Sequence, residues 1–123
     1  MLDEHFDLRD RTKRFALRVL MLCDSLPKTE AARTIGRQLL RSGTSVAANY
    51  RAAGRARSRA EFAAKIGVVV EEADESVFWL ELLVESGMFA KPRLDDLVAE
   101  ANELVSIFVA SQKTVRRKMK ERR

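Results

Sequence analysis

The sequence predicts an all-α protein with one domain, in which four helices pack as a bundle. A chain of 123 residues has the length of a single domain with one core. Only five glycines and two prolines interrupt it, and Ala, Leu, Arg, Glu and Lys dominate, which is a composition typical of long helices. Apolar residues also recur at spacings of three and four along four segments, as expected for helices with one buried face.

The first two helices are expected over about residues 6–25 and 30–54. The first has a narrow apolar stripe, made of Leu8, Phe15, Val19, Leu22 and Leu26. Thr29 is suited to cap the second helix, because its hydroxyl can accept from a free backbone N–H of the first turn. Gly36 and Gly43 lie inside this helix, and we interpret them as points where another helix approaches closely.

The third and fourth helices are expected over about residues 58–86 and 92–118. Ser58-Arg-Ala-Glu61 matches a capping box at the start of the third helix, and Gly87 is a plausible left-handed stop at its end. A basic tail covers about residues 113–123. Two interpretations of this tail stay open: a frayed, solvated end, or a contact with nucleic acid.

Seven arginines and no acidic residue lie between Ala31 and Ala60, which gives this stretch a local charge of +7 in a chain of net charge +5. At about 100° per residue, most of these arginines share one helix face, opposite the apolar face. Residues 61–103 carry −8 and residues 104–123 carry +6. The predicted nucleic-acid-binding residues are Arg33, Arg37, Arg41, Arg51, Arg55, Arg57 and Arg59.

Polar side chains also gather in the middle of this helix, at Ser42, Thr44, Ser45 and Asn49. They can bond back to carbonyl groups one turn earlier in the helix. They can also contact phosphate or sugar beside the arginines. Both interpretations stay open on the sequence alone.

The third helix has apolar residues on two faces. One face continues the core, and the other carries Val68, Phe78, Trp79 and Leu82 among glutamates. A helix that is apolar on two faces needs two partners, so we expect these four residues to form an oligomer interface. The alternative is that both aromatic rings widen the core of a single subunit.

The sequence lacks the residues that most enzymes use. His5 is the only histidine, which excludes a His-rich metal site and argues against a Ser-His-Asp or Cys-His arrangement. No phosphate-binding loop or dinucleotide fingerprint occurs, and the acidic cluster at residues 71–75 has no facing cluster with which to hold a cation. Cys23, the only cysteine, is expected to be a buried, inert thiol. We therefore expect no enzyme, no cofactor and no metal.

The chain begins without a signal peptide and contains no apolar run of about 20 residues, so a soluble, cytoplasmic protein without membrane contact is expected. The basic arginine face favours RNA or DNA as a partner, bound without reading its sequence. An alternative is a structural scaffold in which the arginine face of one subunit meets the acidic third helix of the next.

Several segments together resemble the bacterial four-helix bundle family that includes proteins encoded in intervening sequences of large-subunit ribosomal RNA genes. The resemblance covers almost the full chain. It rests on Phe15-Ala-Leu-Arg-Val19, Gln38-Leu-Leu-Arg-Ser-Gly-Thr-Ser-Val46 with Asn49, Arg57-Ser-Arg-Ala-Glu-Phe62, and Glu71-Glu-Ala-Asp-Glu-Ser-Val-Phe-Trp-Leu-Glu-Leu82. Many relatives have Asn-Ile-Ala-Glu-Gly near Asn49–Gly54. Ala53 replaces the acidic residue of that pattern, so no role of that acid carries over.

The resemblance implies an up-down-up-down bundle that assembles into a homopentamer and whose role is poorly defined. The chain is also similar to accessory proteins of diversity-generating retroelements, which form pentameric barrels that bind nucleic acid and a reverse transcriptase. This similarity adds a third possible role, as an adaptor for a protein partner.

Overall fold

The protein is an all-α four-helix bundle, as the sequence predicts. The computed structural model describes the backbone of residues 4–121, and the side chains of residues 8–121 other than 91 and 93. The four helices are α1 (Glu4–Asp24), α2 (Glu30–Ala53), α3 (Arg59–Ser86) and α4 (Lys91–Glu121).

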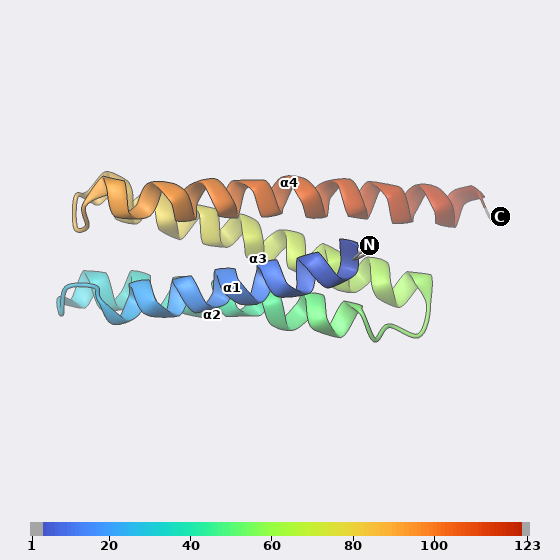
Figure 1. Ribbon diagram of the computed structural model, residues 1–123, viewed down its shortest axis with the longest axis horizontal. Coiled ribbons are helices and arrows are strands. Elements are labelled where there is room, and N and C mark those ends of the chain that lie inside the picture. The colour runs from blue at the N-terminus through green and yellow to red at the C-terminus, as the bar shows by residue number, and fades with distance from the viewer. Residues whose placement is uncertain (1–3, 122–123) are drawn as a thin grey trace.

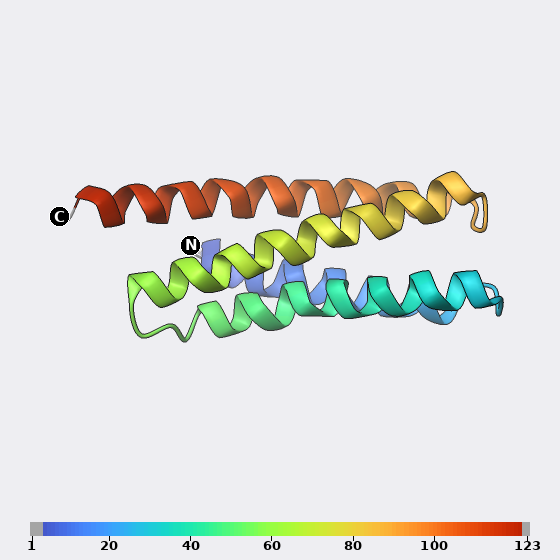
Figure 2. The same cartoon turned by 180° about the vertical axis from the view of Figure 1, so that it is seen from behind.

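Successive helices run in opposite directions, so the topology is up-down-up-down (Figure 1). Helix α2 packs between α1 and α3, and α3 packs between α2 and α4, whereas α1 and α4 touch over a shorter length. Seen from behind, α3 crosses obliquely between α2 and α4 (Figure 2). One end of the bundle holds the first turns of α1, the connection between α2 and α3, and the last turns of α4. We call it the terminal end.

The caps that the sequence predicts are present. Thr29 Oγ1 accepts from the backbone N–H of Ala32 at 3.2 Å, and Ser58 Oγ accepts from that of Glu61 at 3.0 Å. Gly87 ends α3 in the left-handed conformation, with φ of 73°. These contacts satisfy backbone groups that a helix leaves without partners at its ends.

Helix α4 continues to Glu121, three residues beyond the predicted end at about 118, so the tail residues 113–121 are helical. The side chains of Val115 and Met119 are partly buried along this segment. Arg117 also lies 3.8 Å from Glu121, one helical turn away. Residues 122–123 of the predicted tail lie outside the described residues.

The core runs along the bundle axis and includes the predicted apolar stripe of α1. Leu39 and Val46 of α2, Ile66 and Leu80 of α3, and Leu104 of α4 are fully buried. At the level where α2 meets α4, the rings of Tyr50 and Phe108 stand 5.1 Å apart at an angle of 51°.

Two glycines of α2 lie at close helix contacts, as the sequence suggested. A Cβ atom at Gly43 would lie 2.9 Å from both Cγ atoms of Val19, so α1 and α2 can pack at this distance only without a side chain there. A Cβ atom at Gly36 would lie 3.0 Å from Cδ1 of Leu26. The Cys23 thiol donates to the Gly36 carbonyl oxygen at 3.3 Å, so α1 and α2 are also joined by a hydrogen bond.

On its other side, α2 meets α3 through two buried serines. The Ser76 hydroxyl donates to Ser42 Oγ at 2.9 Å, and the Ser42 hydroxyl lies 3.3 Å from the Leu39 carbonyl oxygen that it can donate to. Both serines are fully buried. Ser76 Oγ also lies 2.9 Å from the Glu72 carbonyl oxygen of its own helix. The bond between the two serines places Ser76 level with Ser42 and so marks the register of α3 against α2.

The other polar residues of α2 bond within their own helix. Thr44 Oγ1 donates to the Leu40 carbonyl oxygen at 2.7 Å, and the Asn49 side-chain amide donates to the Ser45 carbonyl oxygen at 3.0 Å. This is the first of the two interpretations of the polar cluster, and it accounts for Ser42, Thr44 and Asn49 without a ligand.

Replacing Gly43 by alanine is expected to lower the free energy of unfolding by up to about 2 kcal/mol. Overpacking a core costs about 1–3 kcal/mol, and Val19 is β-branched and fully buried, so it cannot move aside. The higher helix propensity of alanine offsets only about 1 kcal/mol of this cost. Chemical denaturation monitored by circular dichroism measures the change.

Gly36→Ala is the matched control, because the atom that its Cβ would meet is the end of the flexible Leu26 side chain. Its stability is expected to stay unchanged or to rise by up to about 1 kcal/mol. Equal stabilisation by both substitutions would contradict the close contact at Gly43.

Candidate nucleic-acid interface

All seven predicted arginines have exposed side chains, and none lies in the core. They divide into three sets along the bundle. Arg33 and Arg37 lie near the start of α2, where α1 and α2 form a groove. Arg41 lies in the middle of the helix. The remaining four lie at the terminal end: Arg51, Arg55, Arg57 and Arg59.

Arg41 is held by acidic side chains of its own chain. Its Nη1 lies 2.9 Å from Glu72 Oε2, and its Nη2 bonds to Glu75 Oε1. The same Glu75 oxygen accepts from the indole N–H of Trp79 at 3.2 Å. The Arg41 guanidinium, with a smaller part from Trp79, holds the pKa of the Glu75 carboxyl below its usual value. Arg41 is therefore less available to an external phosphate than the other predicted arginines.

Arg11 joins α1 to α4. Its Nη2 lies 2.6 Å from Glu100 Oε1 and 3.0 Å from Glu103 Oε1, while its Nε donates to Glu100 Oε2 at 3.1 Å. These hydrogen bonds, with Glu100 first, raise the pKa of Arg11 above its ordinary value. The bidentate geometry makes Arg11 a structural cation that holds α1 against α4.

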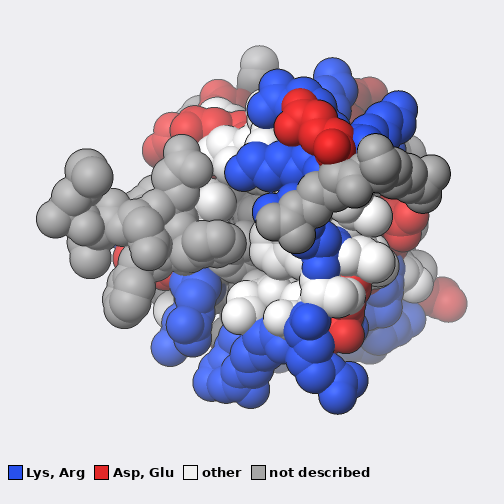
Figure 3. All heavy atoms as spheres, turned by 90° about the vertical axis from the view of Figure 1, so that its right-hand side faces the viewer, with Lys and Arg blue, Asp and Glu red and all other residues white. Residues whose placement is uncertain are grey.

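Cations from all four helices converge at the terminal end. Figure 3 looks onto this end and shows Lys and Arg side chains on several sides of it. Arg9 and Lys13 of α1 and Arg51 of α2 line one shallow cleft there, together with Asp10. We call the whole set the terminal cluster, and its described members are Arg9, Lys13, Arg51, Arg55, Arg57, Arg59, Lys113, Arg116, Arg117, Lys118 and Lys120.

Few acidic groups balance the terminal cluster. Each of three acids there pairs with an arginine one helical turn away: Asp10 with Arg14, Glu61 with Arg57, and Glu121 with Arg117. Among the side chains that the structure describes, no carboxylate lies within 4 Å of the charged groups of Arg9, Lys13, Arg51, Arg55 or Arg59. Positive charge is therefore in excess among these described side chains, with Asp10 as the acidic residue in the cleft of Arg9, Lys13 and Arg51.

The predicted interface residues of α3 differ in exposure. Phe78 is 51% exposed and Val68 is 36% exposed, whereas Trp79 and Leu82 are partly buried. The rings of Phe78 and Trp79 meet edge to face, with centroids 4.9 Å apart. Trp79 packs partly against the core, so widening the core accounts for part of this ring but not for Phe78.

The chain matches the family model of the 23S rRNA-intervening sequence proteins over residues 4–110. It belongs to this family. A solved crystal structure of another protein, from the S23 ribosomal protein family of Bacteroides thetaiotaomicron and of unknown function, is 31% identical and superposes with a TM-score of 0.80. That similarity covers 86% of this chain and 98% of the other. No curated protein matches the sequence. The family resemblance seen in the sequence is thus confirmed.

The family match places Arg51, Arg55, Arg57 and Arg59 inside the matched residues and the cationic end of α4 beyond them. Sequence reasoning missed Arg9 and Lys13, because residues 1–30 carry six basic and six acidic groups and so have no net charge. The signal that finds them is the topology, since an up-down-up-down bundle brings the start of α1 beside the end of α2.

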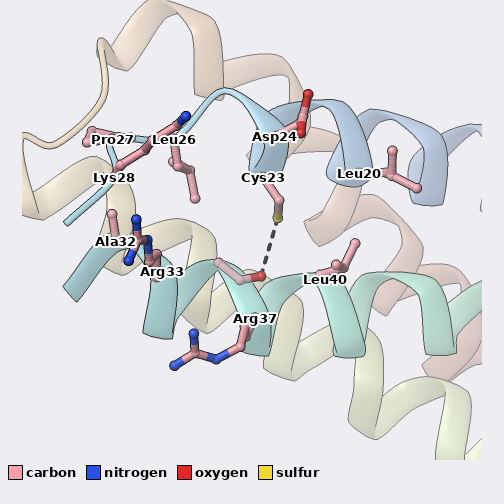
Figure 4. A pocket seen from close by; sticks show the side chains of 11 residues that line it. Leu20, Cys23, Asp24, Leu26, Pro27, Lys28, Ala32, Arg33, Arg37 and Leu40 are labelled. Atoms are coloured by element: carbon pink, nitrogen blue, oxygen red, sulfur yellow. Dashed lines mark hydrogen bonds between the residues drawn. The ribbon is translucent and has the colours of Figure 1, made fainter. Parts of the chain in front are cut away.

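Sequence reasoning also missed an apolar surface on α1 and α2. Leu17, Leu20, Met21 and Leu40 are all exposed, Met21 by 70%. Figure 4 shows Leu20 and Leu40 facing each other across the groove between the two helices, with Arg33 and Arg37 on its α2 side. The signal was present in the sequence: three large apolar residues of α1 lie off its narrow core stripe.

Burial raises the pKa of the Cys23 thiol to about 11, so this cysteine stays protonated, in agreement with the expected inert thiol. Among the described side chains, no group of three His, Cys, Asp or Glu residues is placed to hold a metal ion. Within residues 4–121, no helix has both the length and the apolar character needed to cross a membrane.

Replacing Arg41 by glutamine is expected to raise the pH at which Glu75 titrates. A carboxyl with a lowered pKa in the fold stabilises it above the pKa of the unfolded chain, about 4.3, and this stabilisation is lost as the pH falls through the lower folded value. Trp79 is the only tryptophan and bonds to this carboxylate, so its fluorescence between about pH 5 and 3 follows the titration.

Arg14→Gln is the control, since Arg14 is also exposed and ion-paired, but on α1. Its fluorescence midpoint should equal that of the native protein, and circular dichroism at each pH separates local titration from unfolding. If Arg41→Gln and the native protein share one midpoint, the Arg41–Glu75 pair does not control this carboxyl.

Proposed function

We propose that the protein is a non-enzymatic, self-associating bundle that binds nucleic acid through the sugar–phosphate backbone, without reading its sequence. The observation that carries this proposal is the terminal cluster, in which cations from four helices gather at one end of a rigid scaffold. Guanidinium groups suit this role because their planar forks bind phosphate oxygens through two parallel hydrogen bonds.

The surroundings of the terminal cluster favour backbone contacts over base recognition. Proteins that read single-stranded RNA stack its bases on exposed aromatic side chains. Among the described side chains, Phe78 is the only aromatic residue in the exposed class, and it lies on the middle part of α3, away from the terminal end. Phe62, at the start of α3, is only partly exposed and packs against the core. Cations on stiff helices are therefore the main feature of this end, and they favour a ligand recognised by the spacing of its phosphates.

RNA is the first nucleic acid to test. The description of the family names 23S rRNA, and the similar crystal structure comes from a family described as ribosomal. These names guide the choice of probe, and the physical argument applies equally to DNA. A folded RNA hairpin and a DNA duplex of the same charge distinguish the two, since the 2′-hydroxyl is the group that a protein uses to tell them apart.

Self-association is supported by the exposed apolar residues on two sides of the bundle. Phe78 and Val68 lie on α3, and Leu17, Leu20 and Met21 lie on α1. Soluble monomers rarely expose large contiguous apolar patches, because covering them by another molecule is favourable. The family resemblance implies a pentamer, which would present five terminal clusters to one nucleic acid.

The scaffold alternative is favoured by a different observation. Arg41 already pairs with Glu72 and Glu75 within one chain, which shows that the basic face of α2 and the acidic face of α3 are compatible partners. If all of these charges pair between subunits, the assembly needs no nucleic acid. An adaptor for a protein partner would likewise assemble without binding RNA or DNA.

Removing two charges at the terminal end is expected to weaken RNA binding and its dependence on salt. Arg55→Gln with Arg59→Gln should lower the slope of log K against log salt concentration by about 2, because each phosphate contact contributes about 0.9 through released counterions. Fluorescence anisotropy of a labelled RNA hairpin between about 50 and 200 mM salt measures both quantities.

Arg14→Gln with Arg18→Gln is the matched control, because it also removes two exposed cations, and both lie outside the terminal cluster. Its affinity and slope should equal those of the native protein. Equal losses in both variants would show a response to net charge alone. A native protein that assembles, as judged by its mass in solution, but binds neither RNA nor DNA at 50 mM salt would favour the scaffold.

A further inference from the structure

Two flanks of the bundle expose apolar side chains and differ in shape. On α3, Ala64, Val68, Phe78 and Leu82 share an outward face, from which the Phe78 ring projects; we call it the aromatic flank. On α1 and α2, a groove runs between Leu20 and Leu40, with Leu17 and Met21 beside it (Figure 4). We call it the leucine groove. One surface is a ridge and the other is a hollow.

The charges around the two surfaces have opposite signs. Exposed Glu71 and Glu85 lie along the aromatic flank. Lys28, Arg33 and Arg37 line the leucine groove, with Asp24 as the one acidic residue among its lining side chains. A surface that is apolar and acidic therefore has, on the same molecule, a counterpart that is apolar and basic, as expected for two sides of one interface.

The two surfaces lie at the same height along the bundle. The hydrogen bond between Ser42 and Ser76 sets the level of α3 against antiparallel α2, so Phe78 stands level with Leu40. The close contact of Gly43 with Val19 sets α1 against α2 in the same way, so Leu20 also lies near this level. Glu85 lies nine residues after Ser76, and Arg33 lies nine residues before Ser42. Because α2 and α3 are antiparallel, Glu85 therefore stands level with Arg33.

A single chain cannot bring these surfaces together. Helices α1 and α3 are diagonal in the bundle, their backbones do not approach each other, and α2 packs against both. The leucine groove opens on the outer side of α1 and α2, while Phe78 points outward from α3. The Phe78 ring can therefore enter a leucine groove only in another copy.

We propose that the aromatic flank of one copy docks into the leucine groove of a second copy, with the two bundles side by side and parallel. This interface rests on the self-association proposed above and specifies its two surfaces. Phe78 enters between Leu20 and Leu40 of the neighbour, and Glu85 faces Arg33 of the neighbour at the same height. The contact is heterologous, since each copy uses a different surface on each side.

The arrangement has a consequence for nucleic-acid binding. A heterologous contact, repeated, generates a ring when the rotation closes. Because the bundles are parallel, every terminal cluster then lies on the same side of the ring. Arg33 and Arg37 belong to the subunit contact in this assembly, and the terminal cluster remains open to phosphate.

Cysteine cross-linking tests the docking directly. Cys23→Ser removes the native cysteine, and Leu40→Cys and Phe78→Cys are then introduced into separate chains with different tags. Both sites are exposed, so neither substitution removes a buried contact. We expect a disulfide-linked dimer on a non-reducing gel when the two chains are refolded together and oxidised, and none when either chain is oxidised alone.

A covalent dimer from Phe78→Cys alone would show that α3 meets α3, and it would overturn the proposal. If native protein has the mass of an oligomer but no mixture cross-links, the docking is overturned while self-association stands. If native protein has the mass of one chain in solution, both the docking and the self-association are overturned. RNA binding is measured separately, so a failure of the docking is distinguished from a failure of the nucleic-acid proposal.

A charge exchange gives a second measurement that does not depend on disulfide geometry. Arg33→Glu should lower the mass in solution, because it sets two carboxylates against each other at the contact. Glu85→Lys in the same chain should restore the oligomer by reversing the pair. A mass that stays unchanged in the single variant, or stays low in the double variant, would overturn the pairing of Arg33 with Glu85.

Discussion

The rest of the structure depends on how α2 packs against its two neighbours. Gly43 lets α1 approach until Val19 leaves no room for a Cβ atom, and the buried Ser42–Ser76 hydrogen bond fixes α3 at one level on the other side. Each serine hydroxyl also has a carbonyl partner in its own helix, so this bond acts together with the packing of the buried apolar side chains around it. These contacts therefore set the heights of all other side chains on α1, α2 and α3.

One arginine-rich helix consequently has three kinds of arginine. Arg41 meets Glu72 and Glu75 because the α2–α3 register places these acids beside it. Arg33 and Arg37 border an apolar groove, and Arg51 stands at the terminal end beside cations of α1. The helix itself is continuous, so the difference comes from its neighbours. Arginines that form one stripe on the isolated helix therefore belong to separate sites in the folded bundle.

Much of the fold could be predicted from the sequence, because helix periodicity and caps are local. Thr29, Ser58 and Gly87 mark helix ends through contacts within a few residues, and the core stripe of α1 follows from its spacing. The outward direction of Arg33, Arg37, Arg41, Arg51 and Arg55 was predicted on the same ground, and all five are exposed. The end of α4 was predicted at about residue 118, and the helix continues three residues further, to Glu121. The roles of the predicted site residues stay predictions.

The sequence by itself determined four helices, which face of each is apolar, and an outward arginine face on the second helix, since these follow from a period of 3.6 residues. Only the tertiary structure decided which charges meet. It joined Arg41 to Glu75 and Arg11 to Glu100, gathered Arg9 and Lys13 with Arg51, and set Phe78 level with Leu40. The physical reason is that such pairs are far apart in the chain, and their proximity depends on helix order and register, which buried contacts between helices fix.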